Sequence, residues 1–209
     1  MIYIQKNSAS AEVTQEINRV KRDVNWRQIN TADPAAVRNA FDQLNKSIIR
    51  RELLSEQKGI CAYCMRRIHN DETTVIEHWI PLTTDGTAAL EYDNMLACCD
   101  GGRSSDDNPK ILCCDAAKAN QVITLNPCNK GQMEKIRYRS DGTIYVLPSD
   151  EGLTKDINEV LRLNGEVNHN GKMVNDTATK LVYTRRMVYR DYETFIKRLG
   201  NSENQLDLL

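Results

Sequence analysis

The sequence predicts an α+β protein in which two helical regions flank a central cysteine-rich module. Three observations lead to this fold class. All seven cysteines of the 209-residue chain lie between Cys61 and Cys128. Apolar residues recur at helical spacing before and after that window, and alternating residues around Asp141-Gly142 are typical of a β-hairpin. We expect a helical region at 1–58, the module with its hairpin at 59–148, and a second helical region at 149–209.

The composition narrows the class of protein. Lys and Arg number 28 against 29 Asp and Glu, so the chain lacks the strongly basic character of a protein that binds nucleic acid unaided. Any contact with nucleic acid requires a local patch or a partner subunit. The N-terminus lacks the apolar run of a signal peptide, and no stretch is long and apolar enough to span a membrane. We expect a cytoplasmic protein.

The N-terminal region predicts two helices. The first covers about 11–26, where valines and isoleucines fall on one face. The second begins at Asp33-Pro34, because Asp33 is a typical N-cap and Pro34 suits the first helical position. Its apolar stripe continues through Phe41 and Ile48, and Gly59 is expected to end it.

The segments after the module predict a hairpin and two further helices. Residues 134–139 and 143–147 alternate around Asp141-Gly142, which favours a type I′ turn. The helices are expected at 156–163 and 177–199, and residues 201–209 read as a polar tail. The apolar face of the last helix is expected to point inward, through Leu181, Val188, Tyr192, Phe195 and Leu199.

The cysteines are spaced as ligands of a structural zinc ion. Cys61 and Cys64 form a CxxC knuckle, and the doublets Cys98-Cys99 and Cys113-Cys114 follow. One thiolate from each doublet and two from the knuckle complete a tetrahedral site. A thiol-redox pair is the alternative, but a redox CxxC usually follows a strand, whereas this one follows a helix and a glycine. Spacing alone does not decide which cysteine of each doublet binds.

Three segments in order resemble the HNH endonucleases. They are Glu77-His78-Trp79-Ile80-Pro81, Tyr92-Asp93-Asn94-Met95-Leu96, and the run from Cys114 to Asn120. The resemblance implies a ββα-metal core: a hairpin whose first strand ends in a catalytic histidine, a loop carrying an asparagine, and a helix that supplies a metal ligand.

A closer resemblance adds the segments YDNMLACCDGG, CDAAKAN and LNPC. They are similar to those of PtuB, the family of HNH subunits found in Septu and retron-associated anti-phage systems. That family works beside an ABC-type ATPase of the PtuA type, which implies the same kind of partner here. The family pattern selects Cys99 and Cys114 as zinc ligands. Ala119 stands where the family has glycine, and we expect alanine to fit the helix equally well.

The residues of these segments suit hydrolysis of a phosphodiester, which needs a base for the attacking water and a cation at the phosphate. His78 is expected to be the base, with Asn94 bonded to the loop backbone so as to orient it. Glu77 and Asp115 are hard oxygen ligands for Mg²⁺ or Mn²⁺. Neighbours in a flat strand face opposite sides, so the strand must twist or end for Glu77 and His78 to converge. The competing interpretation is a surface ion pair on an edge strand.

Contacts with nucleic acid are expected from a few cations. Lys118 can neutralise the phosphate or lie on a solvated helix face. Lys135, Arg137 and Arg139 alternate along one strand and can meet a phosphate backbone. The prediction is thus a metal-dependent HNH endonuclease acting on DNA or structured RNA. The alternative is a non-catalytic zinc module that binds nucleic acid or protein.

Overall fold

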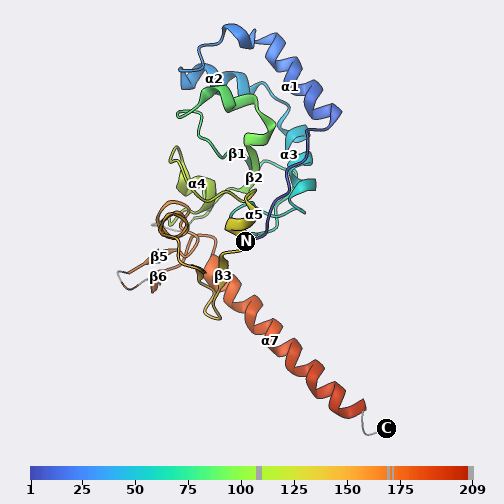
Figure 1. Ribbon diagram of the computed structural model, residues 1–209, viewed down its shortest axis with the longest axis vertical. Coiled ribbons are helices and arrows are strands. Elements are labelled where there is room, and N and C mark those ends of the chain that lie inside the picture. The colour runs from blue at the N-terminus through green and yellow to red at the C-terminus, as the bar shows by residue number, and fades with distance from the viewer. Residues whose placement is uncertain (107–109, 169, 171, 207–209) are drawn as a thin grey trace.

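The computed structural model describes residues 1–106, 110–168, 170 and 172–206, with side chains described up to Lys197 in the last helix. Helices and short strands are mixed along the chain, as the predicted α+β class requires. The strands of this part of the chain form three antiparallel pairs, β1 with β2, β3 with β4 and β5 with β6. Figure 1 shows β1 and β2 beside α3, the strands β3, β5 and β6 lower in the view, and the last helix projecting away from the body.

The N-terminal region contains three α-helices, α1 (Ala11–Asp23), α2 (Pro34–Asp42) and α3 (Lys46–Glu56), and the short 3₁₀ helix η1 (Trp26–Gln28). The predicted cap of α2 is confirmed, because the Asp33 side chain accepts a hydrogen bond from the Ala35 amide. The expectation of a single helix from Asp33 to Gly59 is wrong, because the segment forms two helices, α2 and α3. The Asn45 side chain accepts a hydrogen bond from the Ser47 amide and so caps the start of α3. Because an N-cap residue has a non-helical backbone, the helix is interrupted at Asn45.

The central module is built on the antiparallel pair β1 (Thr74–His78) and β2 (Met95–Cys99), in which Glu77 pairs with Leu96 and His78 with Met95. Two short 3₁₀ helices, η2 (Gly86–Leu90) and η3 (Tyr92–Asn94), lie between the strands. The helix α4 (Cys114–Lys118) follows and packs beside β2.

Helix α4 ends sooner than expected, at Ala119. This alanine has φ 49° and ψ −121°, a conformation that glycine adopts far more easily than residues with a Cβ. The expectation that alanine fits the helix as well as glycine is therefore wrong. The position ends the helix rather than continuing it.

The predicted hairpin is present between β3 (Ile136–Tyr138) and β4 (Ile144–Val146), after the short helix α5 (Lys130–Met133). The type I′ turn is not formed. Gly142 has φ 90°, Asp141 has no positive φ, and the Gly142 amide donates to the Arg139 carbonyl. These features describe a three-residue loop with glycine at the left-handed position.

The C-terminal region contains α6 (Glu151–Lys155), which continues into a π-helical turn, η4 (Asp156–Val160), and the pair β5 (Glu166–Val167) and β6 (Met173–Asn175). The last helix, α7, spans Leu181–Leu206. It starts after the predicted Thr177 because the Asp176 carboxylate accepts from the amides of Val182 and Tyr183. The expected polar tail is helical up to Leu206.

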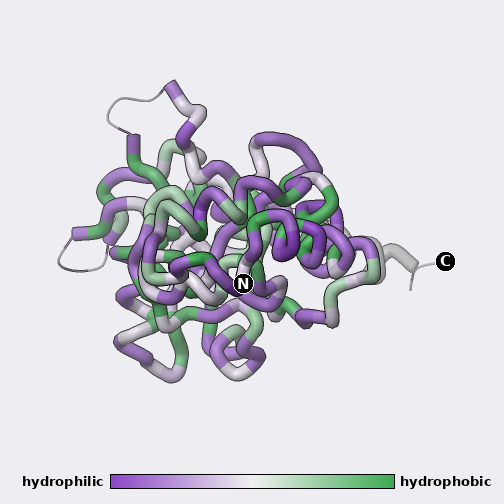
Figure 2. Tube along the Cα trace, turned by 90° about the horizontal axis from the view of Figure 1, so that it is seen from above, coloured by the Kyte–Doolittle hydropathy of each residue, from purple (hydrophilic) through white to green (hydrophobic). Residues whose placement is uncertain are grey.

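A large core joins most of these elements, from Met1 and Val13 through Leu53 and Met95 to Leu181. A second, small cluster of Val37, Leu82 and Ala89 lies between α2 and η2. Hydrophilic and hydrophobic residues alternate along most of the chain in Figure 2, as expected of elements buried on one side. Within the described ranges, no helix has the length and apolar character needed to cross a bilayer.

Candidate metal centre and active site

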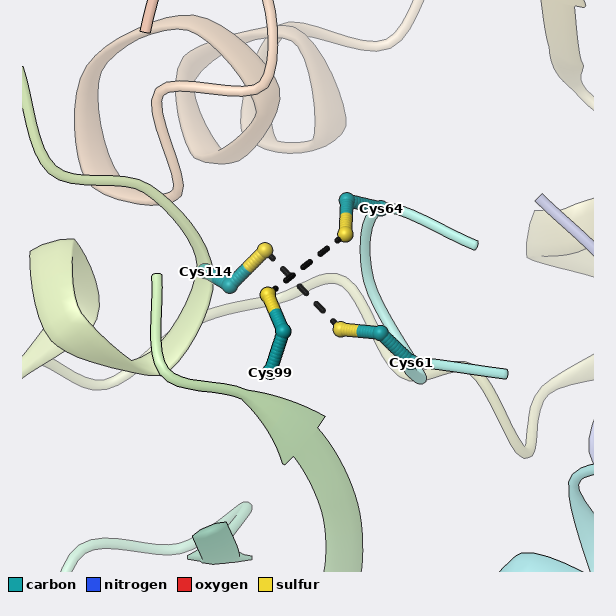
Figure 3. A group of neighbouring side chains, drawn as sticks. All are labelled: Cys61, Cys64, Cys99 and Cys114. Atoms are coloured by element: carbon teal, nitrogen blue, oxygen red, sulfur yellow. Dashed lines mark hydrogen bonds between the residues drawn. The ribbon is translucent and has the colours of Figure 1, made fainter. Parts of the chain in front are cut away.

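Four cysteines from three segments meet in the interior. The sulfur atoms of Cys61, Cys64, Cys99 and Cys114 all lie within 4.8 Å of one another, and all four residues are buried. Figure 3 shows the side chains pointing at a common centre. The Cys61 and Cys114 sulfurs are 3.9 Å apart, and those of Cys64 and Cys99 are 3.7 Å apart.

Local structure places each of these sulfurs. Gly59, with φ 68°, turns the chain out of α3, and the Met65 amide closes the knuckle by donating to the Cys61 carbonyl. Cys99 is the last residue of β2, and Cys114 is the first of α4. The cluster therefore ties a loop, a strand and a helix together.

The cluster fits a tetrahedral ion. With metal–sulfur bonds of about 2.3 Å, ligand sulfurs around zinc are about 3.8 Å apart, which matches the separations of 3.9 and 3.7 Å given above. These four residues are the set that the family pattern selects. Cys98 and Cys113 are buried outside the set, and Cys128 is half-buried. The four-cysteine group could hold a metal ion such as zinc.

Glu77 lies in a buried polar site directly beside this cluster. Its Oε1 accepts a hydrogen bond from the Tyr63 hydroxyl at 3.1 Å and lies 2.7 Å from the Lys118 ammonium. Burial raises the pKa of Glu77 from 4.5 to about 8, and a hydrogen bond to the Asp115 carboxyl and its charge add to this rise. The positive charge of Lys118 opposes the shift. The Asp115 carboxyl therefore lies close to Glu77, and two neighbouring carboxyls are a site where a cation is favourable.

Asp115 contributes the second carboxyl from the first turn of α4. Its Oδ2 lies 2.9 Å from the guanidinium of Arg103, which comes from the loop after β2. Both predicted ligands of the catalytic ion are thus paired with a cation of the chain itself. Glu77 and Asp115 are hard oxygen donors and fit Mg²⁺ or Mn²⁺.

His78 is the last residue of β1 and is 5% exposed. Its Nε2 lies 3.0 Å from the Ala89 carbonyl, and its ring stacks edge-on against Phe41 of α2 at 4.4 Å. A carbonyl only accepts, so Nε2 carries the proton of the neutral ring and Nδ1 keeps a lone pair. Burial, reinforced by Arg38, Lys46 and Lys118, lowers the pKa of His78 to about 4, against the weaker opposing effect of the Ala89 contact.

Asn94 makes the loop contacts expected of it. Its Oδ1 accepts from the Ile80 amide at 2.8 Å, and its Nδ2 donates to the carbonyls of Ile80 and Ala88. Because Ala88 precedes the residue that contacts His78, the amide holds the loop on which the imidazole rests. A role of Asn94 in catalysis stays a prediction.

Lys118 differs from its predicted setting. The side chain is 1% exposed, so the interpretation of Lys118 as part of a solvated helix face is wrong. Its ammonium group cannot reach a nucleic acid in this conformation. It lies 2.7 Å from Glu77 Oε1 and donates to the His78 carbonyl at 3.0 Å. The surface ion pair proposed for Glu77 and His78 is also wrong, because both side chains are buried.

The side chains of Glu77 and His78 contact different neighbours. Glu77 meets Tyr63 and Lys118, whereas His78 meets Phe41 and Ala89. This divergence follows from the alternation of side chains along a strand, which β1 maintains up to its last residue. Convergence of the two side chains on one ion stays a prediction.

The three predicted cations in and next to β3 differ in their exposure to solvent. Lys135 pairs with Asp150 at 3.0 Å and is half-buried. Arg137 and Arg139 are exposed, although Arg139 lies 4.3 Å above the Tyr145 ring. Only these two arginines of the predicted set present cations at the surface.

Two residues of the site escaped the sequence analysis. Tyr63 lies inside the CxxC knuckle and donates to Glu77, and Phe41 covers His78 from a helix 37 positions earlier in the chain. The position of Tyr63 between two ligands was the available signal, whereas nothing local marks Phe41. No protein-family model matches the chain, and no curated protein does so either.

Proposed function

We propose that the protein is a metal-dependent HNH-type endonuclease that hydrolyses phosphodiester bonds, serving as nuclease subunit beside an ABC-type ATPase in anti-phage defence. The family resemblance of the sequence motivates the partner and the role. The carboxyls of Glu77 and Asp115, brought together beside the strand end that carries His78, are the observation that carries the chemistry. The order of β1, β2 and α4 around the cysteine cluster agrees with the proposal.

Each residue has a part in this proposal. Glu77 and Asp115 would hold a Mg²⁺ or Mn²⁺ ion, which would supply positive charge to neutralise the phosphate. His78 is neutral at physiological pH, as a general base must be, and accepts the proton of the attacking water at Nδ1. Asn94 and the Ala89 carbonyl fix the tautomer and the direction of the ring.

The site is closed to a polymeric substrate in this conformation, because Glu77 and His78 are 4% and 5% exposed. Phe41 and Lys118 cover the two side chains from opposite directions. Activity therefore requires a rearrangement that moves these groups, and binding of the ATPase or of nucleic acid supplies the free energy for it. Arg137 and Arg139 are the surface cations that the proposal assigns to the phosphate backbone.

The test is cleavage by the chain assembled with its ATPase, assayed on duplex DNA, single-stranded DNA and structured RNA with and without Mn²⁺. His78→Ala is expected to lower the rate at least about 100-fold, in the range for loss of a general base, while zinc content stays the same. His69→Ala is the matched control, since His69 is an exposed histidine of a loop. Wild-type rates for His78→Ala would reject the mechanism.

A second function is favoured by the closed site. A non-catalytic zinc module would also bury Glu77 with Lys118 as a structural pair. It would bind nucleic acid or the ATPase without Mg²⁺ or Mn²⁺. It predicts that Glu77→Gln and Asp115→Asn leave nucleic-acid and ATPase binding unchanged and that no cleavage depends on Mn²⁺. Cleavage lost in both variants with binding retained would instead establish the nuclease.

A further inference from the structure

Helix α7 leaves the body without a covering partner among the described residues. It has 26 residues, which is roughly 39 Å at 1.5 Å per residue. From Tyr183 to Lys197 no side chain is fully buried, and Figure 1 shows the helix pointing away from every other element. Helices of this kind owe most of their stability to packing rather than to intrinsic propensity.

The exposed helix carries an apolar seam. Val188, Tyr192 and Phe195 are 64%, 62% and 57% exposed, and the flanking Tyr189 and Ile196 are 38% and 45% exposed. The sequence analysis placed the first three inward, and that expectation is wrong. Their spacing of four and then three residues is that of helices that pair side by side.

A groove at the base of α7 continues this seam. It encloses about 480 Å³ and is lined mainly by apolar atoms, with Cys64, Met65 and Tyr138 on the body side and Leu181, Val188 and Tyr192 on the helix side. Val188 and Tyr192 belong to both the groove and the seam. The apolar surface therefore runs without interruption from the zinc knuckle along the helix.

We propose that this surface binds the α7 helix of a second copy of the chain, in antiparallel orientation. A two-fold axis between residues 193 and 194 puts Tyr192 opposite Phe195 of the second copy, and the reverse pair follows by symmetry. The same axis puts Tyr189 opposite position 198, which is an arginine, and Ile196 opposite Asp191, so these two side chains lie at the edge of the seam. It also brings Val188 opposite position 199, which is a leucine in the sequence. Val188, Tyr192 and Phe195 thus each meet an apolar position.

The charge distribution along the segment favours the antiparallel arrangement. Residues 180–190 contain four cations and no acid, whereas residues 191–209 contain four acids and two cations. With the axis between residues 193 and 194, residues 181–190 of one copy, with a net charge of +3, face residues 197–206 of the other, with a net charge of +1, and the acids Asp191 and Glu193 lie near the axis. Parallel pairing would put Arg185 opposite its own copy and align the two basic halves, and like charges at close range are unfavourable.

The area available is sufficient for a specific dimer. At their observed exposures, the three aromatic rings with Val188 and Ile196 offer roughly 500 Å² per copy, more than half of the ~800 Å² per partner in a standard interface. The polar neighbours along the helix and the walls of the groove supply the remainder.

The test is the mass of the full-length chain by sedimentation equilibrium, where a dimer has twice 23.8 kDa. Tyr192→Glu is expected to weaken self-association by about 100-fold, because it buries an unpaired carboxylate against an aromatic ring. Tyr183→Glu is the matched control: Tyr183 is 52% exposed but lies off the seam, so this variant should remain dimeric. Circular dichroism and zinc content check that both variants fold.

A charge swap tests the orientation. In the antiparallel register, the double variant Tyr192→Glu/Phe195→Lys pairs each new carboxylate with the new ammonium of the other copy, so dimerisation is expected to recover relative to Tyr192→Glu alone. In a parallel dimer the two new charges would face their own kind and association would stay lost. A wild-type chain that sediments as a monomer, or a double variant that does not recover, overturns the proposal.

Discussion

At the scale of single residues, the buried contact between Lys118 and Glu77 explains more of the site than any other interaction. The two side chains are 1% and 4% exposed and lie 2.7 Å apart. Removing one partner of such a pair leaves a buried polar group without its compensating charge, which is more costly than the pair itself is favourable.

Lys118→Met is therefore expected to lower the free energy of unfolding by about 3 kcal/mol, measured by urea denaturation at about pH 9, where Glu77, with its pKa of about 8, is ionised. The double variant Lys118→Met/Glu77→Gln should recover part of that loss, since the glutamine carries no charge. Lys130→Met is the control, because the Lys130 side chain is 72% exposed and its removal should change stability little. Equal losses in both lysine variants would contradict the buried role.

The raised pKa of Glu77 predicts how stability changes with pH. In the folded chain its pKa is about 8 rather than 4.5, so the folded state binds more protons than the unfolded state between these values. Stability from this group is then present below pH 4.5 and decreases as pH rises to 8. Wild type should lose stability relative to Glu77→Gln between pH 6.5 and 8, and parallel curves for the two proteins would show that Glu77 does not titrate in that window.

Ala119 holds a backbone conformation that costs free energy in the native state. With φ 49° and ψ −121° it lies where a Cβ is unfavourable. Ala119→Gly should raise the free energy of unfolding by about 1 kcal/mol, seen as a higher melting temperature. Ala117→Gly, inside α4, should lower it, because glycine weakens a helix interior. Destabilisation by both changes would argue against the assigned conformation.

At the scale of elements, the hairpin turn fixes the start of α7. Gly142 has φ 90°, and a Cβ there would lie 2.1 Å from the Val182 carbonyl oxygen in the first turn of that helix. The close approach lets the β3–β4 loop pack on α7, and no larger residue can occupy the position without moving one of the two elements.

Gly142→Ala is accordingly expected to lower the free energy of unfolding by about 3 kcal/mol and to speed amide hydrogen exchange at the start of α7. Gly131→Ala serves as control, because a Cβ at Gly131 meets nothing closer than 3.5 Å and alanine suits helix α5. Normal exchange in Gly142→Ala would mean that the turn does not support the helix.

At the scale of the whole molecule, the cysteine cluster joins segments that short-range structure cannot hold together. Cys61 and Cys114 are 53 positions apart and come from a loop and a helix, with Cys99 of β2 between them. Metal bound to such a cluster contributes its binding free energy to folding, because the unfolded chain has no comparable site.

Chelation is therefore expected to lower the melting temperature and release about one zinc per chain, measured by calorimetry and elemental analysis. Cys61→Ala should lose both the metal and soluble expression, whereas Cys128→Ala, outside the cluster, should keep both. A protein that melts at the same temperature with and without chelator would show that the cluster binds no structural ion.

The sequence by itself determined the local features. The Asp33 cap, the hairpin at Gly142 and the strand carrying Glu77 and His78 follow from residues close together in the chain, where propensity and periodicity act. The four cysteines were found through the family pattern, since spacing alone left each doublet open.

Only the tertiary structure decided how distant groups meet. Lys118 is buried against Glu77, Phe41 covers His78, and Tyr192 on α7 is exposed rather than inward. The physical reason is that an apolar stripe or a charged residue specifies a face but not the neighbour it meets. That neighbour depends on packing across the whole core, to which one short segment contributes little.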